Sequence, residues 1–163
     1  MRKLFFVVTI IAFLLCSNLV FADTYKFSVG YGQQYGGFGL SSEAQLNFIA
    51  LGGGLGYFTS PITSQGIIGY EVFGKLIYPV SALSSAYLAA GVGTIGCEEI
   101  LVGTQSNVSS IIGPFVLIGS EFNFSKNTFF LVDVGMAFSE KFTEYFGQSS
   151  LITFDIGVGF KSQ

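Results

Sequence analysis

Apolar and polar residues alternate along most of this chain, most regularly over residues 150–160. Every second position in that segment carries a large apolar side chain: Ile152, Phe154, Ile156, Val158 and Phe160. The positions between them carry mostly small or polar residues. Because successive side chains of a β-strand point to opposite faces, this segment is predicted to be a strand with one apolar face and one small or polar face.

The same period of two recurs along the rest of the chain and predicts eight strands in all. Their expected ranges are 24–32, 37–46, 48–59, 67–78, 86–96, 111–124, 128–139 and 150–160. Strands of roughly ten residues suit a tilted crossing of a bilayer, and eight is the smallest common strand number of a membrane barrel. We therefore expect an all-β fold, an eight-stranded antiparallel transmembrane β-barrel.

The connections between these strands differ in length. Short turns are expected at residues 33–36 and 125–127, and longer polar loops at 60–66, 97–109 and 140–149. Outer-membrane barrels have short periplasmic turns and longer extracellular loops. If the first strand starts in the periplasm, all three longer loops are expected outside the cell.

The composition favours a membrane protein without membrane helices. Apolar residues make up 50% of the chain and charged residues 10%, whereas a soluble domain carries about a quarter charged residues. After residue 22 there is no apolar run of the ~20 residues that a membrane helix needs. The alternative is a soluble secreted β-barrel that binds an apolar ligand, which would need a polar outside and an apolar inside.

Residues 1–22 have the pattern of a secretory signal peptide. Arg2 and Lys3 give a positive start, residues 4–15 form an apolar stretch with one polar residue, and cleavage is expected after Ala22. This apolar stretch is too short for a spanning helix and has the order of regions that a signal peptide has. We therefore expect export through the secretory pathway.

The remaining residues, 23–163, are expected to form one outer-membrane β-barrel domain. A lipoprotein with its lipid on Cys16 is the alternative reading of the N-terminus, but the bulky residues 13–15 stand where a lipid-attachment motif has small ones. Cleavage after residue 22 leaves Cys97 as the one cysteine of the mature chain, so no disulfide within the chain is expected.

Charged residues of the strands fall on the small or polar face, which is the inward face of a membrane barrel. Seven positions share this parity: Lys26, Glu43, Glu71, Lys75, Glu121, Asp133 and Asp155. Charges within a membrane span are expected to pair or to be hydrated in the lumen. We predict a lumen polar network; a narrow path for protons or cations is the alternative. Glycines recur on the same face, where small residues relieve crowding in a narrow barrel.

The residues offer no support for an enzyme or a nucleic-acid-binding protein. The chain contains no histidine, and its Ser, Asp and Glu residues form no recognisable nucleophile and base motif. Loss of Arg2 and Lys3 leaves five lysines against ten acidic residues. A net acidic chain lacks the basic surface that nucleic acid requires. We expect no catalytic residue, no cofactor and no metal site.

The chain resembles the small OmpA/OmpX-type outer-membrane β-barrels, a porin-like family. The resemblance lies in the signal at residues 2–22, the opening strand at 25–32 and the closing strand at 154–160. It implies a non-enzymatic protein of a Gram-negative-type cell envelope, with a structural, surface-binding or small-solute role. Outer-membrane lipid and the outer-membrane assembly machinery are the implied partners. The family ends in an aromatic residue, whereas here Phe160 is followed by three further residues.

Overall fold

A computed structural model describes residues 22–59, 65–102 and 105–162. The predicted signal peptide at 1–22 therefore lies, except for Ala22, outside the described residues. Among the residues that the structure describes, no helix is long and apolar enough to cross a bilayer.

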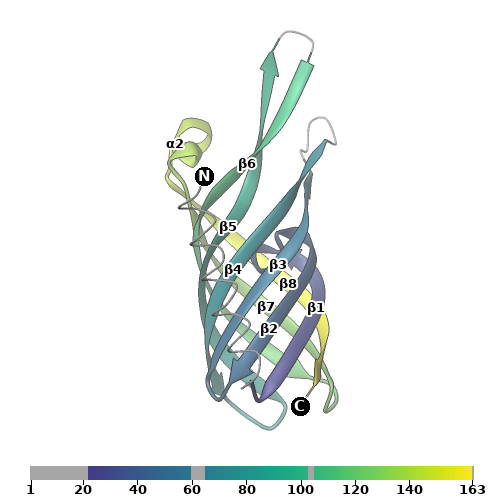
Figure 1. Ribbon diagram of the computed structural model, residues 1–163. Coiled ribbons are helices and arrows are strands. Elements are labelled where there is room, and N and C mark those ends of the chain that lie inside the picture. The colour runs from purple at the N-terminus through teal and green to yellow at the C-terminus, as the bar shows by residue number, and fades with distance from the viewer. Residues whose placement is uncertain (1–21, 60–64, 103–104, 163) are drawn as a thin grey trace, which may run out of the picture.

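The chain forms a closed antiparallel barrel of eight strands, in which each strand pairs with its neighbours in sequence (Figure 1). The strands are β1 (Thr24–Gly32), β2 (Gly37–Leu46), β3 (Ile49–Thr59), β4 (Gly66–Pro79), β5 (Ser84–Val102), β6 (Gln105–Asn123), β7 (Thr128–Phe138) and β8 (Ser150–Ser162). β1 pairs with β8 and closes the barrel, with Phe27 opposite Phe160. The predicted fold class and strand number are confirmed.

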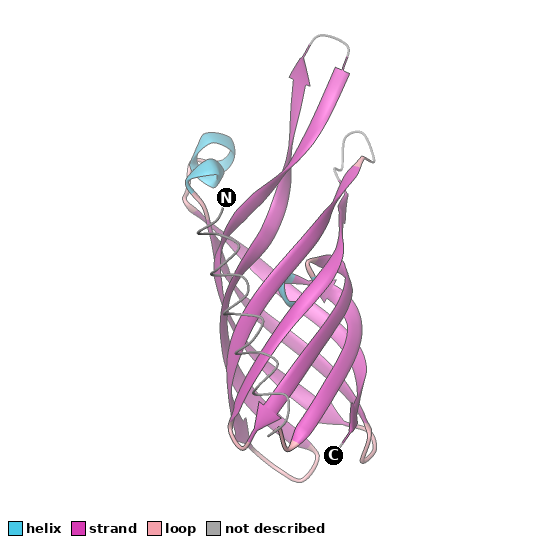
Figure 2. Cartoon of the chain, viewed as in Figure 1, coloured by secondary structure: helices cyan, strands magenta, loops and turns pink. Residues whose placement is uncertain are grey.

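The two ends of the barrel differ, as Figure 2 shows. One end carries the tight connections β2–β3, β4–β5 and β6–β7 together with the end of β8; we call it the short-turn end. The opposite end, the long-loop end, carries η1 (Gln33–Tyr35), the β5–β6 hairpin and α2 (Glu140–Phe146). At the β2–β3 turn, Asn47 adopts a positive φ of 53°, a conformation that asparagine tolerates better than most residues.

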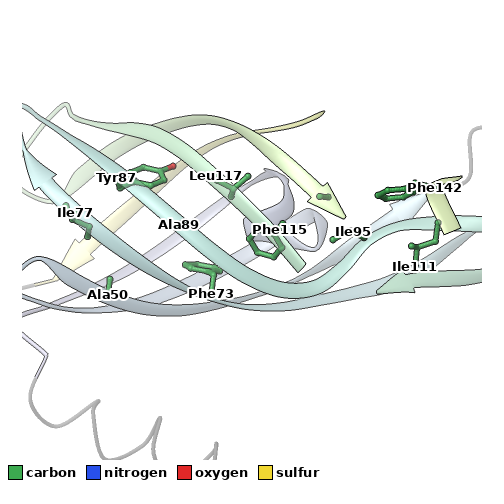
Figure 3. Close-up of a cluster of buried hydrophobic side chains, with 11 residues drawn as sticks. Ala50, Phe73, Ile77, Tyr87, Ala89, Ile95, Ile111, Phe115, Leu117 and Phe142 are labelled. Atoms are coloured by element: carbon green, nitrogen blue, oxygen red, sulfur yellow. The ribbon is translucent and has the colours of Figure 1, made fainter. Parts of the chain in front are cut away.

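The alternation of the sequence is realised as two barrel surfaces of opposite character. Every strand contributes large apolar side chains that are at least half exposed on the outside, among them Phe27, Leu40, Leu55, Ile68, Leu88, Ile118, Val134 and Phe154. The buried apolar side chains point inward and form a cluster that extends along the barrel interior and includes Phe73, Ile77, Tyr87, Phe115 and Leu117 (Figure 3). The apolar outer surface thus surrounds an interior that holds these buried side chains.

The expected loop at 97–109 is wrong, because β5 and β6 remain paired up to Val102 and Gln105. β5 loses its partner β4 beyond Gly93, and β6 gains its partner β7 only from Phe115 onward. The segment is therefore the outer part of a hairpin that projects beyond the barrel wall (Figure 1). Polar residues indicated a loop, but a hairpin beyond the wall needs no apolar face toward lipid and can be polar.

The other two expected loops have different outcomes. The stretch 140–149 contains α2, where the Ser139 hydroxyl accepts a hydrogen bond from the Lys141 N–H and Gly147 ends the helix in a left-handed conformation. Such an N-cap and such a glycine are common helix-end signals. Of the expected loop at 60–66, residues 60–64 lie outside the described residues.

Candidate functional site in the barrel interior

The seven residues predicted for the lumen all have their side chains buried inside the barrel. Their exposed fractions run from 0% for Asp155 to 7% for Glu43. They come from β1, β2, β4, β6, β7 and β8, each of which directs its even or odd positions inward. The structure brings them together in two groups at different heights rather than in one network.

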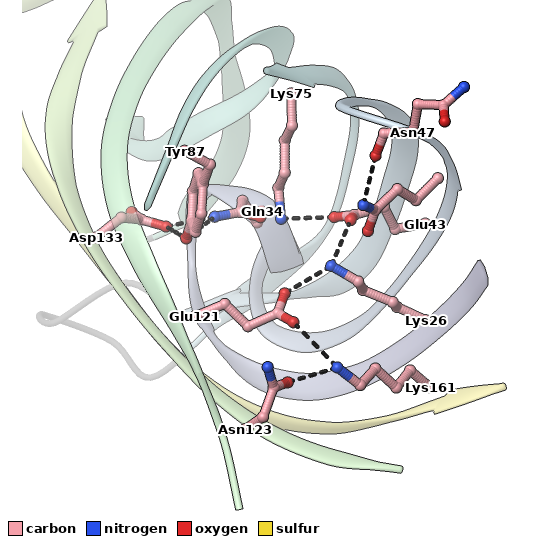
Figure 4. A network of polar contacts seen from close by, with 11 residues as sticks. Lys26, Gln34, Glu43, Asn47, Lys75, Tyr87, Glu121, Asn123, Asp133 and Lys161 are labelled. Carbon is pink, nitrogen blue, oxygen red and sulfur yellow. Dashed lines mark hydrogen bonds and ion pairs between the residues drawn. The ribbon is translucent and has the colours of Figure 1, made fainter. Parts of the chain in front are cut away.

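The first group lies toward the short-turn end and is a chain of alternating lysines and glutamates. Lys75 Nζ lies 2.6 Å from Glu43 Oε2, and Glu43 Oε1 lies 3.3 Å from Lys26 Nζ. Lys26 Nζ in turn lies 2.7 Å from Glu121 Oε2. Lys161 extends this lysine–glutamate chain, with its Nζ 4.0 Å from Glu121 Oε1 (Figure 4). Three lysines and two glutamates leave it with one net positive charge.

The lysine–glutamate chain also contacts aromatic side chains of the barrel interior. Lys75 Nζ lies 4.6 Å from the ring centroid of Tyr87 and 5.1 Å from that of Phe73. Lys26 Nζ lies 5.7 Å from the ring of Phe129. Aromatic faces attract cations. The ammonium groups thus have both carboxylate and aromatic partners.

The second group consists of Glu71, Asp133 and Asp155, which we call the carboxylate trio. Asp133 and Asp155 lie directly opposite each other on β7 and β8. Neither these two nor Glu71 forms an ion pair with a lysine of the described residues, whose ion pairs all involve other carboxylates. The trio instead binds a segment of backbone that enters the barrel from the long-loop end.

That segment is the β1–β2 connection, residues 33–36, which folds into the lumen and which we call the plug loop. The backbone N–H groups of Gln33 and Gln34 donate to the two carboxylate oxygens of Asp155, at 2.5 and 2.8 Å. The Gly36 N–H donates to Glu71 Oε1 at 2.5 Å. The Gln34 side-chain amide donates to Asp133, which also accepts from the Tyr87 hydroxyl at 2.6 Å.

Sequence reasoning missed the plug loop, since residues 33–36 were predicted only as a short turn. Gln33, Gln34 and Tyr35 are buried, with Tyr35 0% exposed. Three glycines at the ends of the loop, Gly32, Gly36 and Gly37, have positive φ angles that let the backbone reverse and enter the barrel. Polar residues between such glycines are typical of any turn, so this local sequence does not reveal the inward direction.

The inward glycines are the sequence feature that could have indicated the plug loop. A Cβ atom added to any of six of them would overlap atoms of the plug loop: Gly30, Gly39, Gly54, Gly56, Gly69 and Gly157. These six, the glycine cradle, lie on five strands around the loop. Their presence was explained by crowding in a narrow barrel, and the structure identifies the crowding object as the protein's own loop.

Within the described part of the chain, the interior has no metal-binding constellation, because no group of three or more His, Cys, Asp or Glu residues is placed to hold a metal ion. The charged groups near the short-turn end form ion pairs with one another. The carboxylate trio forms hydrogen bonds mainly with backbone N–H groups of the plug loop.

Outside the barrel wall, the long-loop end carries a second polar contact. Phe142 of α2 packs in one cluster with Ile95 and Ile111 at the base of the β5–β6 hairpin (Figure 3). Lys141 forms an ion pair with Glu98, which also accepts a hydrogen bond from the Ser109 hydroxyl at 2.7 Å. The helix therefore supports the projecting hairpin.

Solved structures of small outer-membrane barrels are similar to this chain, although no protein-family model and no curated protein matches it. The N-terminal β-barrel domain of OprF from Pseudomonas aeruginosa aligns with a TM-score of 0.67 and 11% identity, over 86% of this chain and 98% of that one. Ail, the attachment invasion locus protein of Yersinia pestis, aligns with a TM-score of 0.55 and 18% identity, over 86% and 99%. Identities this low establish the fold alone. The resemblance expected from the sequence is confirmed at that level: this chain has the fold of the small eight-stranded outer-membrane β-barrels.

Proposed function

We propose that this chain is a non-enzymatic integral outer-membrane protein that acts through its surface and whose lumen is filled by side chains. The observation that carries the proposal is the reversed distribution of polarity. Large apolar side chains on all eight strands are exposed outside, while seven charged side chains are buried inside. Soluble monomers rarely expose an apolar surface of this extent, whereas lipid solvates it.

The proposed orientation puts the short-turn end in the periplasm and the long-loop end outside the cell. Short periplasmic turns and longer outer loops are the rule for outer-membrane barrels. Export by the predicted signal peptide at 1–22 and insertion by the outer-membrane assembly machinery complete this proposal. Outer-membrane lipid would then contact the exposed apolar belt.

The role proposed is structural and surface-binding rather than conducting. The lysine–glutamate chain, the apolar cluster and the plug loop all occupy the barrel interior, and each obstructs the lumen. The projecting β5–β6 hairpin, supported by α2, offers a surface for contact with molecules outside the cell. The similarity to Ail, named an attachment invasion locus protein, accords with a surface-binding role.

The alternative of a soluble barrel with an apolar ligand gains no support from the described residues. Such a barrel needs an apolar chamber, but seven charged side chains and the plug loop take up this interior. The exposed apolar belt would also be unexplained. We therefore retain one proposed function.

Fractionation of cells that express the full chain tests the proposal. The protein is expected to sediment with outer membranes, to resist extraction by salt and to dissolve in detergent. Unboiled samples are expected to migrate on a denaturing gel as a compact species distinct from the boiled chain. Recovery in the soluble periplasmic fraction would overturn membrane insertion.

A further inference from the structure

A notch opens in the outer wall of the barrel where β6 and β7 separate. The ladder between these two strands ends at Phe115 opposite Ala137, while β6 stays paired with β5 along the hairpin. Pro114, the residue of β6 just beyond this ladder, has no backbone N–H with which to extend it. The notch has a volume of about 530 Å³, which is within the range of small-molecule sites. We call it the wall notch; its lining comes from residues 112–114, residues 138–141 and Ser149.

One side of the wall notch is apolar and continues the outer belt of the barrel. Ile112 and Pro114 are exposed, and Phe138 has the same parity as the outward residues of β7. The next outward residues are Val116 on β6 and Met136 on β7, both of which are exposed in the belt. Lipid chains cover that belt under the proposed function. The apolar side of the wall notch is therefore continuous with lipid.

The other side of the wall notch is polar and carries one charge of each sign. Glu140 and Lys141 are adjacent at the start of α2, and both are exposed. Lys141 pairs with Glu98 of the hairpin, whereas Glu140 forms no ion pair with any of the described residues. A lysine ammonium can join two anionic groups, as Lys26 joins two glutamates in the lumen. This polar side therefore suits a headgroup that carries a negative and a positive charge close together.

We propose that the wall notch binds one lipid molecule with a phosphoethanolamine headgroup, taken from the leaflet at the long-loop end. Its acyl chain lies against Ile112, Pro114 and Phe138. Its phosphate pairs with Lys141, and its ammonium pairs with Glu140. The inference rests on the proposed function, because only a barrel that spans a membrane meets lipid along this surface.

Other lipid headgroups fit the polar side less well. Glu98 and Glu140 outnumber Lys141 there, so an anionic headgroup without an ammonium would add a third negative charge and be repelled. A choline headgroup is positively charged but has no N–H that could donate a charge-assisted hydrogen bond to Glu140. The favoured headgroup therefore has a primary ammonium beside its phosphate.

Quenching of tryptophan fluorescence by brominated lipid measures which lipid occupies the wall notch. The chain has no tryptophan, so Phe138→Trp gives a single reporter and keeps an aromatic ring in the notch. The full chain is placed in vesicles of equal parts phosphatidylethanolamine and phosphatidylcholine, with bromine on the acyl chains of one lipid or of the other. Quenching is expected to show an about two- to fivefold preference for phosphatidylethanolamine, as an exposed ion pair would give.

Phe38→Trp, made in the otherwise unaltered chain, is the matched control. Phe38 lies near the long-loop end of β2, is 65% exposed and does not line the wall notch. This reporter is expected to show no preference between the two lipids. Equal quenching of Phe138→Trp by both lipids would overturn the inference and leave the membrane barrel standing. Absence of quenching at both positions would overturn the proposed function as well.

Two matched charge variants locate the headgroup. In the Phe138→Trp background, Glu140→Gln is expected to abolish the preference for phosphatidylethanolamine. Glu144→Gln removes another exposed acidic side chain of α2, which does not line the wall notch, and is expected to keep the preference. An equal effect of the two variants would overturn the inference. Brominated phosphatidylglycerol, which has a phosphate but no ammonium, is expected to quench no better than phosphatidylcholine, and stronger quenching than by phosphatidylethanolamine would also overturn it.

Native mass spectrometry of the unaltered protein gives a second readout that needs no reporter. Protein in detergent with an equimolar mixture of phosphatidylethanolamine and phosphatidylcholine is expected to retain one molecule of phosphatidylethanolamine. Equal retention of the two lipids would overturn the inference even where a reporter variant does not fold. The compact species on unboiled gels identifies the variants whose barrel is intact.

Discussion

The lysine–glutamate chain makes a quantitative prediction about Lys75. Its ammonium has one carboxylate partner, Glu43, at 2.6 Å, and both side chains are at most 5% exposed. Lys75→Met removes the charge and keeps most of the volume, which leaves Glu43 with Lys26 alone at 3.3 Å. Breaking a buried ion pair by removal of one partner costs roughly 3–5 kcal/mol. The aromatic contacts of Lys75 with Tyr87 and Phe73 are lost as well.

Lys161→Met is the matched control. Its side chain is 15% exposed and lies at the far end of the same chain, 4.0 Å from Glu121. It also donates a hydrogen bond to Asn123 Oδ1 at 2.6 Å. A hydrogen bond from a charged donor contributes about 1.5–3 kcal/mol, less where water reaches it, so the control is expected to be the milder change.

The double variant Lys75→Met/Glu43→Gln separates pairing from packing. It leaves two lysines and one glutamate, so the net charge of the chain remains one positive, and the pair Lys26–Glu121 is retained at 2.7 Å. Replacement of both partners of a buried ion pair by uncharged residues of similar volume is often nearly neutral, and the remaining cost here is the longer contact of Glu43 with Lys26 at 3.3 Å. We therefore expect the double variant to recover most of the loss caused by Lys75→Met.

Urea unfolding in lipid vesicles, followed by the loss of the compact species on unboiled gels, measures these differences. The expected order of stability is wild type, then Lys161→Met and the double variant, then Lys75→Met. Equal destabilisation by Lys75→Met and Lys161→Met would refute the buried ion-pair chain. A double variant as unstable as the sum of its two single variants would show that Lys75 and Glu43 do not act as a pair.

Three further predictions follow from the two barrel surfaces and the plug loop. Val134→Arg, on the outside of β7, should destabilise the barrel in vesicles by about 2–4 kcal/mol if it lies near the bilayer midplane, whereas Glu140→Arg in exposed α2 should change the same urea midpoint little; similar midpoints would contradict the lipid-facing assignment. Gly157→Ala should unseat the plug loop, because its Cβ would overlap the Tyr35 hydroxyl, whereas the Cβ of Gly74→Ala would meet its nearest atom at an ordinary 3.6 Å. Limited proteolysis should cut the loop in the first variant alone, and equal resistance of the two variants would contradict the glycine cradle. Planar-bilayer recordings of the wild type should show little or no steady conductance, since side chains fill an eight-stranded lumen; large stable channels would contradict the filled interior.

The period of two predicted both the strands and their inward residues, because the parity of a position alone decides which face of the barrel wall a residue occupies. Lys26 and Asp155, near opposite ends of the chain, were assigned to the same interior for that reason. Parity does not give the height of a residue along the barrel axis. It therefore could not divide the seven charged residues into a paired group and an unpaired group, since that division depends on strand register.

Two features could not be predicted from the sequence, for physical reasons. Glu98 was expected in a hydrated loop, but it is buried and bonded to Lys141 and Ser109, because the hairpin remains paired and α2 folds against its base. The plug loop escaped because a turn that enters the lumen and a turn that points to solvent use the same residues. Only glycines on other strands distinguish the inward turn from the outward one. The closed barrel brings these glycines next to the loop.

The most direct test of the account asks on which side of the outer membrane each end of the barrel lies. Asn107→Cys, in the projecting hairpin, and Asn127→Cys, in the β6–β7 turn, are exposed positions of the same residue type at opposite ends of the barrel. Each is made in a Cys97→Ser background and treated with a membrane-impermeant maleimide. The account predicts labelling of Asn107→Cys on intact cells and of Asn127→Cys only after the outer membrane is permeabilised. Equal labelling of both positions under both conditions would contradict a barrel that spans the outer membrane.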